Sequence, residues 1–299
     1  RILDRAFYNC KGLGYITIPS SVTTIGWEAF KSKSLTIAFA EGMETIPRRA
    51  LYKSSGIVSV IIPSSVTTIG EEALTAACEF ELVFAEGTKS IPWLEYSYAN
   101  DDPGVVSVII PSSVNNIGRA FVHYVNLETI VVDAGNTVFY SERNCLIKKE
   151  SKKLIRGCKT SVIPQDIKSI GDYAFEYCDE LEEINIPSSV TSIGEYAFYG
   201  CNELECITIP SSVTSIGKYA FYGCNKLGCI TIPSSVTSIG DYAFAGRLAR
   251  SIKLSRWLKK KRAESMGTSS SRSVRVMALP VRLLMRTGVP SRIRLTICI

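Results

Sequence analysis

The 299-residue chain holds few side chains that could carry out covalent chemistry. A Ser-His-acid or Cys-His arrangement needs a base beside the nucleophile, and His123 is the single histidine in the sequence. It lies in the stretch RAFVHYVNL (residues 119–127), where we expect an exposed or capping role. No catalytic residue is therefore predicted, and we expect the protein not to be an enzyme.

Metal and cofactor sites also lack the residue spacing that they need. No CxxC pair is present, and the ten cysteines are spread along the chain, unlike the clustered ligands of zinc sites. No GxxxxGKS/T or GxGxxG motif offers a cradle for phosphate. The acids Asp179, Glu180, Glu182 and Glu183 fit a solvated edge better than an acid/base pair. We therefore predict no metal and no cofactor, and a function that resides on a surface.

The sequence itself repeats, which explains the spread of its cysteines. Residues 186–244 contain the phrase IPSSVTSIGxYAF three times at a constant interval. The Ala-Phe or Ala-Leu pair that marks the phase ends at Phe7, Phe30, Leu51, Leu74, Phe121, Phe175, Phe198, Phe221 and Phe244, with a degenerate copy at Leu94. A fixed period of about 23 residues predicts a solenoid, here of about ten coils, in which each coil buries its apolar edge against its neighbours.

The sequence of one repeat predicts which of its residues form the core, the strand and the turn. The in-phase apolar residues should point inward and form the core: Leu204, Ile207, Ile209, Val213, Ile216, Ala220, Phe221 and Cys224. Residues 206–209 alternate with period two, which indicates a short strand in a parallel ladder, ended by Pro210. Residues 216–223 predict a short helical turn. The fold class is thus α/β, with parallel strands on one face and helical turns on the other.

The glycine that follows isoleucine in each IPSSVTSIG segment, such as Gly217, needs its own explanation. Pro47 and Pro92 occupy the position of Gly217 in other repeats, so we expect no positive φ there. We expect this glycine to allow close approach of neighbouring coils.

The interval between Phe121 and Phe175 is more than twice as long as the interval between Phe175 and Phe198, so it is too long for one coil. Apolar and polar residues alternate around Val138, Tyr140, Leu146 and Ile147 and again around Leu154 and Ile155, with KKESKK between the two runs. We predict a β-hairpin insert at about residues 131–163, with KKESKK as its charged turn. An unstructured loop fits less well, because the segment is rich in β-formers.

The wording LxxIxIPSSVTSIGxYAFxGC resembles the BspA-like leucine-rich repeats, a class of irregular length found in bacterial surface proteins and in some protists. The resemblance covers residues 1–246, and the insert resembles a non-repeat island of that family. It implies a leucine-rich-repeat solenoid that binds proteins or attaches to host or matrix surfaces, at the cell surface or after secretion. The alternative is a cytoplasmic scaffold for protein–protein interaction, which fits unpaired thiols and the absence of an Asn-x-Ser/Thr sequon.

If the isoleucines of the strand point inward, the alternate residues form an exposed strand face. The candidate binding residues are Tyr15, Thr17, Ser59, Ile61, Ser107, Ile109, Thr129, Val131, Glu183, Asn185, Cys206, Thr208, Cys229 and Thr231. Each threonine alone is explained equally well by strand propensity. As a row, these residues offer the extended surface that solenoids present to protein partners.

The phase of the cysteines separates them into groups. Cys10, Cys178, Cys201 and Cys224 share one position, where we expect buried thiols. Cys206 and Cys229 flank the strand on its outer side, one coil apart, and whether they bond stays open. In the insert, Cys145 and Cys158 could pair in an oxidising compartment.

Residues 247–299 form a basic tail without the repeat phase. Of the 34 basic and 28 acidic residues in the chain, the tail has fourteen basic residues and one acid, Glu264, which leaves 20 basic and 27 acidic residues before it. WLKKKR suggests contact with an anionic membrane or nucleic acid. A disordered or helical cap is a second interpretation, and translation of repeat DNA out of frame after Gly246 is a third. We favour the third because the break is abrupt, so no nucleic-acid partner is expected.

The chain begins at Arg1, inside a repeat, without an initiator methionine or a signal-peptide pattern. We therefore expect it to be a fragment. It contains no run of 18 or more apolar residues, so no membrane span is predicted.

Overall fold

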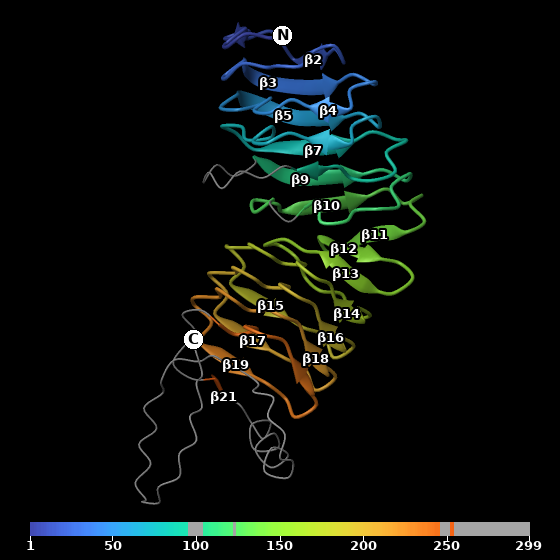
Figure 1. Cartoon of the computed structure of the whole chain (residues 1–299), viewed down its shortest axis with the longest axis vertical. Coiled ribbons are helices and arrows are strands. Elements are labelled where there is room, and N and C mark those ends of the chain that lie inside the picture. The colour runs from blue at the N-terminus through green and yellow to red at the C-terminus, as the bar shows by residue number, and fades with distance from the viewer. Residues whose placement is uncertain (95–103, 122–123, 246–251, 254–299) are drawn as a thin grey trace, which may run out of the picture. The chain divides into compact units, whose positions relative to one another are not determined.

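The computed structural model describes residues 1–94, 104–121, 124–245 and 252–253, and within them it consists of strands and turns (Figure 1). The chain divides into two compact units. Unit 1 comprises residues 1–152 and 156–161, and unit 2 comprises residues 153–155 and 162–299.

Unit 1 is built on a parallel sheet in which each coil adds a strand. The sheet runs in the order β1 (Phe7–Tyr8), β3 (Phe30–Phe39), β5 (Ser55–Ile62), β7 (Phe80–Phe84), β9 (Val105–Ile110) and β10 (Thr129–Val132), with β2 (Tyr15–Ile18) also paired to β3. A second, smaller parallel sheet contains β4 (Thr45–Ile46), β6 (Thr68–Ile69) and β8 (Trp93–Leu94). The unit also holds the antiparallel hairpin of β11 (Phe139–Glu142) and β12 (Cys145–Lys148).

Unit 2 also has two strands in each coil. One ladder contains β15 (Glu183–Asn185), β17 (Cys206–Thr208), β19 (Cys229–Thr231) and β21 (Ile252–Lys253). The other ladder begins at β13 (Lys153–Arg156) and continues through β14 (Ser169–Ile170), β16 (Ser192–Ile193), β18 (Ser215–Ile216) and β20 (Ser238–Ile239). From β14 onward, each residue of this ladder pairs with the equivalent residue of the next repeat. The predicted parallel solenoid is thus confirmed.

The ladder of β15, β17, β19 and β21 continues past residue 246. Ile230 pairs with Ile252, and Thr231 pairs with Lys253. Ile252 follows Ile230 by 22 residues, whereas Ile230 follows Ile207 by 23, so these two pairs leave the predicted loss of the repeat phase in the tail untested. The remainder of the tail lies outside the described residues.

The described residues contain no helix, so the predicted helical turns are wrong. The reason lies in where the backbone N–H groups donate. In the YAFYG segment, the amides of Tyr219, Phe221 and Gly223 donate to carbonyls of the next coil, those of Asp241, Ala243 and Ala245. An α-helix would need these donors for its own turns. Tyr219 also has φ 55°, in the left-handed region that interrupts a right-handed helix.

The core is a set of side-chain columns that run from coil to coil. The eight in-phase residues of the repeat, predicted to point inward, are each at most 4% exposed. Phe175, Phe198, Phe221 and Phe244 stack face to face, with ring centroids 5.1, 5.1 and 5.3 Å apart. Each ring covers the next, so the apolar area of one coil is buried only if its neighbours are present.

The insert contains the predicted turn at KKESKK, between β12 and β13, and one further turn that was not predicted from the sequence. The antiparallel pair β11 and β12 is closed by Arg143 and Asn144, both in the left-handed region at φ 50° and 57°, as a two-residue hairpin turn requires. The KKESKK segment forms a second turn, at residues 149–152, after β12. The sequence prediction read β11 and β12 as one run because no Gly or Pro marks the first turn.

The close-approach role expected for Gly217 is confirmed. Its φ is not positive, and a Cβ added there would lie 2.4 Å from the backbone nitrogen of Glu195 in the preceding coil. At Gly228 the nearest atom would be 3.8 Å away, an ordinary contact.

Gly217→Ala should therefore destabilise the protein by about 1–3 kcal/mol, because the backbone of two coils must move apart. Gly228→Ala is the matched control and should change stability by less than about 0.5 kcal/mol. Urea unfolding of the two variants measures both effects. Equal stabilities would show that coil spacing at Gly217 is not constrained.

Candidate functional site

The strand face of unit 2 alternates as the sequence predicts. Ile184, Ile207 and Ile230 are buried, while the described side chains on either side of them face outward. The exposed residues of this face are Glu183, Asn185, Cys206, Thr208 and Thr231. Cys229 pairs in register with Cys206 along the backbone, and its side chain lies outside the described part of the structure.

The strand face of unit 1 is longer and consists of two rows that cross β2, β3, β5, β7, β9 and β10. The first row is polar: Tyr15, Thr36, Ser59, Glu81, Ser107 and Thr129. The second row is mostly aliphatic: Thr17, Ala38, Ile61, Val83, Ile109 and Val131. None of these twelve side chains except Ala38 is buried.

Sequence reasoning omitted four members of these rows, namely Thr36, Ala38, Glu81 and Val83. They belong to the two shorter units, whose strands lack the IPSS ending of the others. The sequence FAEG, which begins at the last residue of both strands, is the signal that could have aligned them.

Two bulges add further valines to the outer surface of unit 1. The register of β3 and β5 shifts between the pairs Leu35–Ile57 and Thr36–Ser59, which leaves Val58 as the extra residue. Val58 is 46% exposed. The same shift between β7 and β9 leaves Val106 as the extra residue.

The phase-equivalent cysteines are buried, with one exception. Cys178, Cys201 and Cys224 are at most 2% exposed, whereas Cys10 is only half-buried. The thiols of Cys201 and Cys224 donate to the carbonyls of Phe175 and Phe198, each at 3.1 Å. Burial raises the pKa of Cys201 well above its ordinary value, which keeps the thiol protonated.

Cys145 and Cys158 of the insert are also buried. The sulfur of Cys158 lies 3.4 Å from the hydroxyl of Ser161, and burial raises the pKa of Cys145 to about 12. The thiol of Cys145 is therefore a poor nucleophile near neutral pH.

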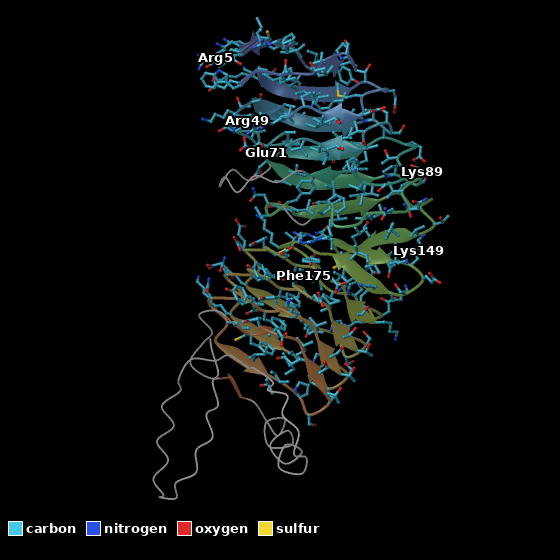
Figure 2. All side chains as sticks on the ribbon, viewed as in Figure 1. Arg5, Arg49, Glu71, Lys89, Lys149 and Phe175 are labelled. Carbon is cyan, nitrogen blue, oxygen red and sulfur yellow. The ribbon has the colours of Figure 1, made fainter. Side chains whose placement is uncertain are left out.

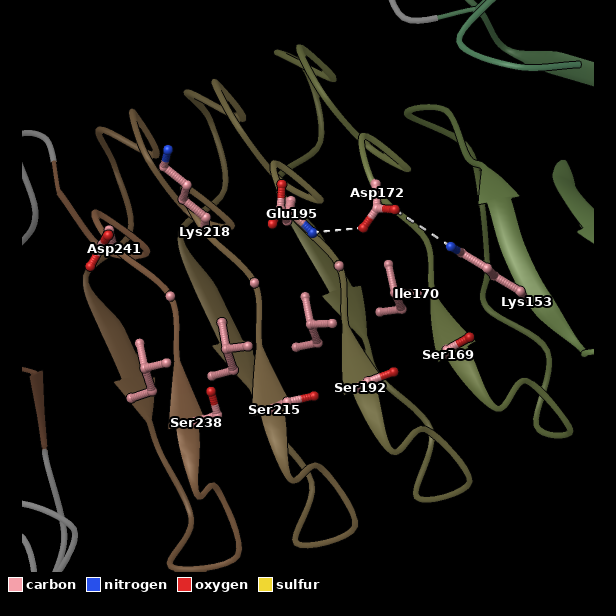
Figure 3. A pocket seen from close by; sticks show the side chains of 16 residues that line it. Lys153, Ser169, Ile170, Asp172, Ser192, Glu195, Ser215, Lys218, Ser238 and Asp241 are labelled. Atoms are coloured by element: carbon pink, nitrogen blue, oxygen red, sulfur yellow. Dashed lines mark hydrogen bonds and ion pairs between the residues drawn. The ribbon is translucent and has the colours of Figure 1, made fainter.

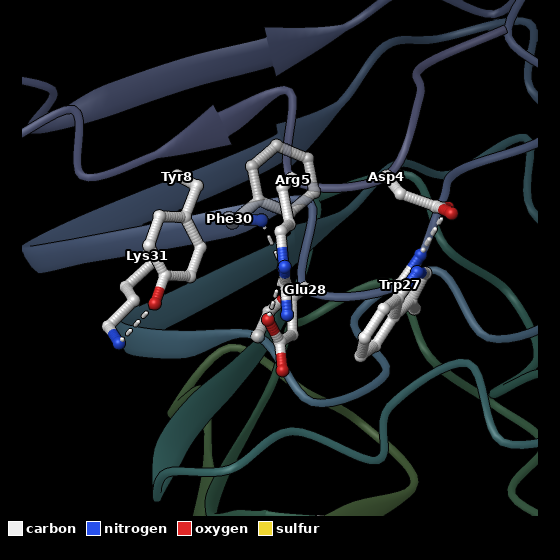
Figure 4. A network of polar contacts seen from close by, with 8 residues as sticks. Asp4, Arg5, Tyr8, Trp27, Glu28, Phe30 and Lys31 are labelled. Carbon is white, nitrogen blue, oxygen red and sulfur yellow. Dashed lines mark hydrogen bonds and ion pairs between the residues drawn. The ribbon is translucent and has the colours of Figure 1, made fainter.

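Charged and aromatic side chains gather at one edge of unit 1 (Figure 4). The guanidinium of Arg5 is paired with Glu28 at 2.8 Å and lies 4.6 Å from the ring centroid of Trp27. The ammonium of Lys31 donates to the hydroxyl of Tyr8 at 3.0 Å. These contacts join residues about one coil apart, so we assign this cluster to coil stacking.

The same edge continues along the unit, where Figure 2 shows Arg5, Arg49 and Glu71 on one side. Arg48 pairs with Glu71 at 2.7 Å, and Arg49 pairs with Glu72. Arg48 and Glu71 are both partly exposed, so their ion pair contributes little to stability, whereas the carboxylate of Glu72 is buried beside Arg49.

A groove of about 560 Å³ lies over the second ladder of unit 2 (Figure 3). Its lining repeats from coil to coil: a serine and an isoleucine of the strand, the following glycine in the last three coils, and then a charged residue. The serines are Ser169, Ser192, Ser215 and Ser238, and the charged residues are Lys153, Asp172, Glu195, Lys218 and Asp241. The groove was not predicted from the sequence, because every serine of IPSSVTSIG was interpreted as a turn former.

Within the described residues, no three His, Cys, Asp or Glu side chains converge as metal ligands. His123 lies outside these residues. A search for a helix with the length and hydropathy of a membrane span finds none in the described part of the chain.

A sequence profile for the BspA type leucine-rich repeat region matches the chain in 6 copies, over residues 1–100, 36–150 and 145–265. The chain belongs to the BspA-type leucine-rich-repeat family. A comparison with curated proteins gives no match.

Solved structures similar to this BspA-type protein come from bacteria. A leucine-rich repeat protein from Eubacterium ventriosum is 23% identical, with 73% of this chain and 72% of that chain covered and a TM-score of 0.52, which supports the fold. The pneumococcal vaccine antigen PcpA is 25% identical, with coverage of 78% and 67% and a TM-score of 0.45. A leucine rich cell surface protein from Faecalibacterium prausnitzii is 27% identical, with coverage of 87% and 84% and a TM-score of 0.45.

The positions of the cysteines in the BspA-type repeats predict their reactivity. Cys206 is exposed on the strand face, whereas Cys201 and Cys224 are enclosed, and burial keeps Cys201 protonated. A short pulse of iodoacetamide on the folded protein should therefore label the peptide of Cys206 at least about tenfold faster than those of Cys201 and Cys224. Peptide mapping by mass spectrometry measures the rates, with urea-unfolded protein as the control. Equal rates in the folded protein would contradict the assigned phase.

Proposed function

We propose that this BspA-type repeat protein is a non-enzymatic protein-binding module, and that its partner docks on the strand face. The observation that carries the proposal is the pair of rows on unit 1, one polar and one aliphatic, across strands that are already paired with each other. A partner on this face makes side-chain contacts, because the strand edges are used within the solenoid.

The composition of the face supports a protein partner. Glu81 is the one charged residue in the two rows of unit 1, and centres of protein interfaces are depleted in charge. Val131 is 42% exposed and Tyr15 is 56% exposed, so the rows offer apolar area to a partner at both ends. A polyanion would need basic residues, and the rows contain none.

The strand face of unit 2 is proposed as a second contact surface of the same kind. Its exposed residues, Glu183, Asn185, Cys206, Thr208 and Thr231, are small or polar. They suit the hydrogen-bonded rim of an interface better than its apolar centre.

We place the module at a cell surface or in a secreted protein, where its partner is a host, matrix or other surface protein. This location is supported by the resemblance to BspA-like repeats, which are found in bacterial surface proteins. An intracellular scaffold is the second candidate, favoured by the buried thiol donors Cys201 and Cys224. Titration of thiols in unfolded protein purified from its native source separates the two. Ten free thiols favour the intracellular candidate, and bonded cysteines favour the secreted one.

The docking proposal is tested with a matched pair of valines. Val131 lies on the strand face at 42% exposure, and Val162 lies outside the strands at 52% exposure. Against a panel of purified extracellular-matrix and serum proteins, Val131→Glu should weaken the observed binding at least about tenfold, because a carboxylate is placed in the apolar row. Val162→Glu should leave the affinity unchanged. Surface plasmon resonance measures both.

Two results would contradict this function. One is the absence of binding to every protein of the panel. The other is binding that Val131→Glu does not weaken or that Val162→Glu weakens equally.

A further inference from the structure

The groove of unit 2 carries a row of hydroxyl groups that the fold does not use. In each repeat, two other hydroxyls bond to the preceding coil: Ser212 Oγ donates to the carbonyl of Val190 at 2.6 Å, and Thr214 Oγ1 donates to that of Thr191 at 3.2 Å. The same pattern holds one coil later, at Ser235 and Thr237. These side chains are needed for coil stacking.

The serine that follows the threonine behaves differently. Among the described residues, the side chains of Ser169, Ser192, Ser215 and Ser238 make no hydrogen bond. Each is at least partly exposed, and all four line the groove (Figure 3). The result is a line of available donors and acceptors, one in each coil.

Two of the three carboxylates on the rim are similarly available. Glu195 and Asp241 form no ion pair within the described residues, whereas Asp172 is 3.6 Å from Lys153. The ammonium of Lys218 lies over the ring of Tyr219, at 5.1 Å. With three acids and two lysines on the rim, the groove has no excess of positive charge that would select a polyanion.

The floor of the groove excludes pairing with a peptide strand. The amides of Gly194, Gly217 and Gly240 already donate to carbonyls of the preceding coil at 2.8–2.9 Å. The groove crosses successive strands, so a peptide lying along it would run at right angles to the ladder. Its hydrogen-bonding groups must be met by side chains alone.

The spacing of the coils, each of which contributes one serine, matches a polymer that presents polar groups at a fixed repeat. Equivalent rings of successive coils are 5.1 Å apart, and adjacent strands are generally about 4.8 Å apart. A pyranose ring linked at its opposite ends in a β-linked glycan is close to this length and has no net charge. Hydroxyls and carboxylates are the groups that hydrogen-bond sugar hydroxyls.

We propose that this groove binds a neutral, linear, β-linked oligosaccharide along the solenoid axis, with one sugar against each coil. The serine hydroxyls bond the sugar hydroxyls from one side, and Glu195 and Asp241 accept from them on the other. The site is separate from the strand face, so it adds carbohydrate binding to the proposed protein-binding function.

Calorimetric titration of the full chain with cellohexaose and with chitohexaose tests the site. Ser192→Ala/Ser215→Ala should weaken binding about tenfold, the loss of two hydrogen bonds. The matched control is Ser188→Ala/Ser211→Ala, which makes the same change in the same coils at exposed serines that line no part of the groove. The control should bind like the unaltered protein.

A further comparison tests whether the length of one sugar must match the spacing of the coils. Maltohexaose, whose α-linked chain curves, should bind at least about tenfold more weakly than the β-linked hexasaccharides. The proposal is overturned if neither β-linked probe binds, if both serine variants lose affinity equally, or if maltohexaose binds as well. Val131→Glu should leave sugar binding intact, which distinguishes this site from the strand face.

Discussion

The structure depends on the stacking of each coil on the next in the same phase. In unit 2, amides of one coil donate to carbonyls of its neighbour at the spacing of the sequence repeat, and the columns of Phe, Ile and Cys follow the same spacing. A single coil satisfies few of its own backbone groups and buries little of its own apolar area. Its conformation is stable only between two neighbours.

This constraint explains the local backbone. The left-handed tyrosines Tyr173, Tyr196, Tyr219 and Tyr242 recur at the same phase, with φ between 54° and 59°. The left-handed region is unfavourable for a tyrosine, and it persists here because the intercoil hydrogen bonds on both sides fix the chain. Stacking of the tyrosine rings, at 4.9–5.0 Å, contributes to the same alignment.

Much of this arrangement could be predicted from the sequence, because phase is visible in it. The alternation around Ile207 predicted the strand and its outward residues, and the position of Cys201 predicted its burial. The helical turn could not be excluded, since Tyr-Ala-Phe has no propensity that forbids a helix, and the direction of its amides appears only when coils are stacked. Likewise, Ser212 and Ser215 are the same residue type, and only the structure separates the one that bonds to the fold from the one that faces the groove.

The central claim is that the coils are stable only together, and Phe198→Ala tests it most directly. Removing this ring leaves Phe175 and Phe221 each without a stacking partner on that side. Hydrogen exchange followed by mass spectrometry should show faster exchange at Tyr173 and Phe175 and at Tyr219 and Phe221, as well as in the altered coil. Faster exchange confined to residues 193–208 would contradict the account.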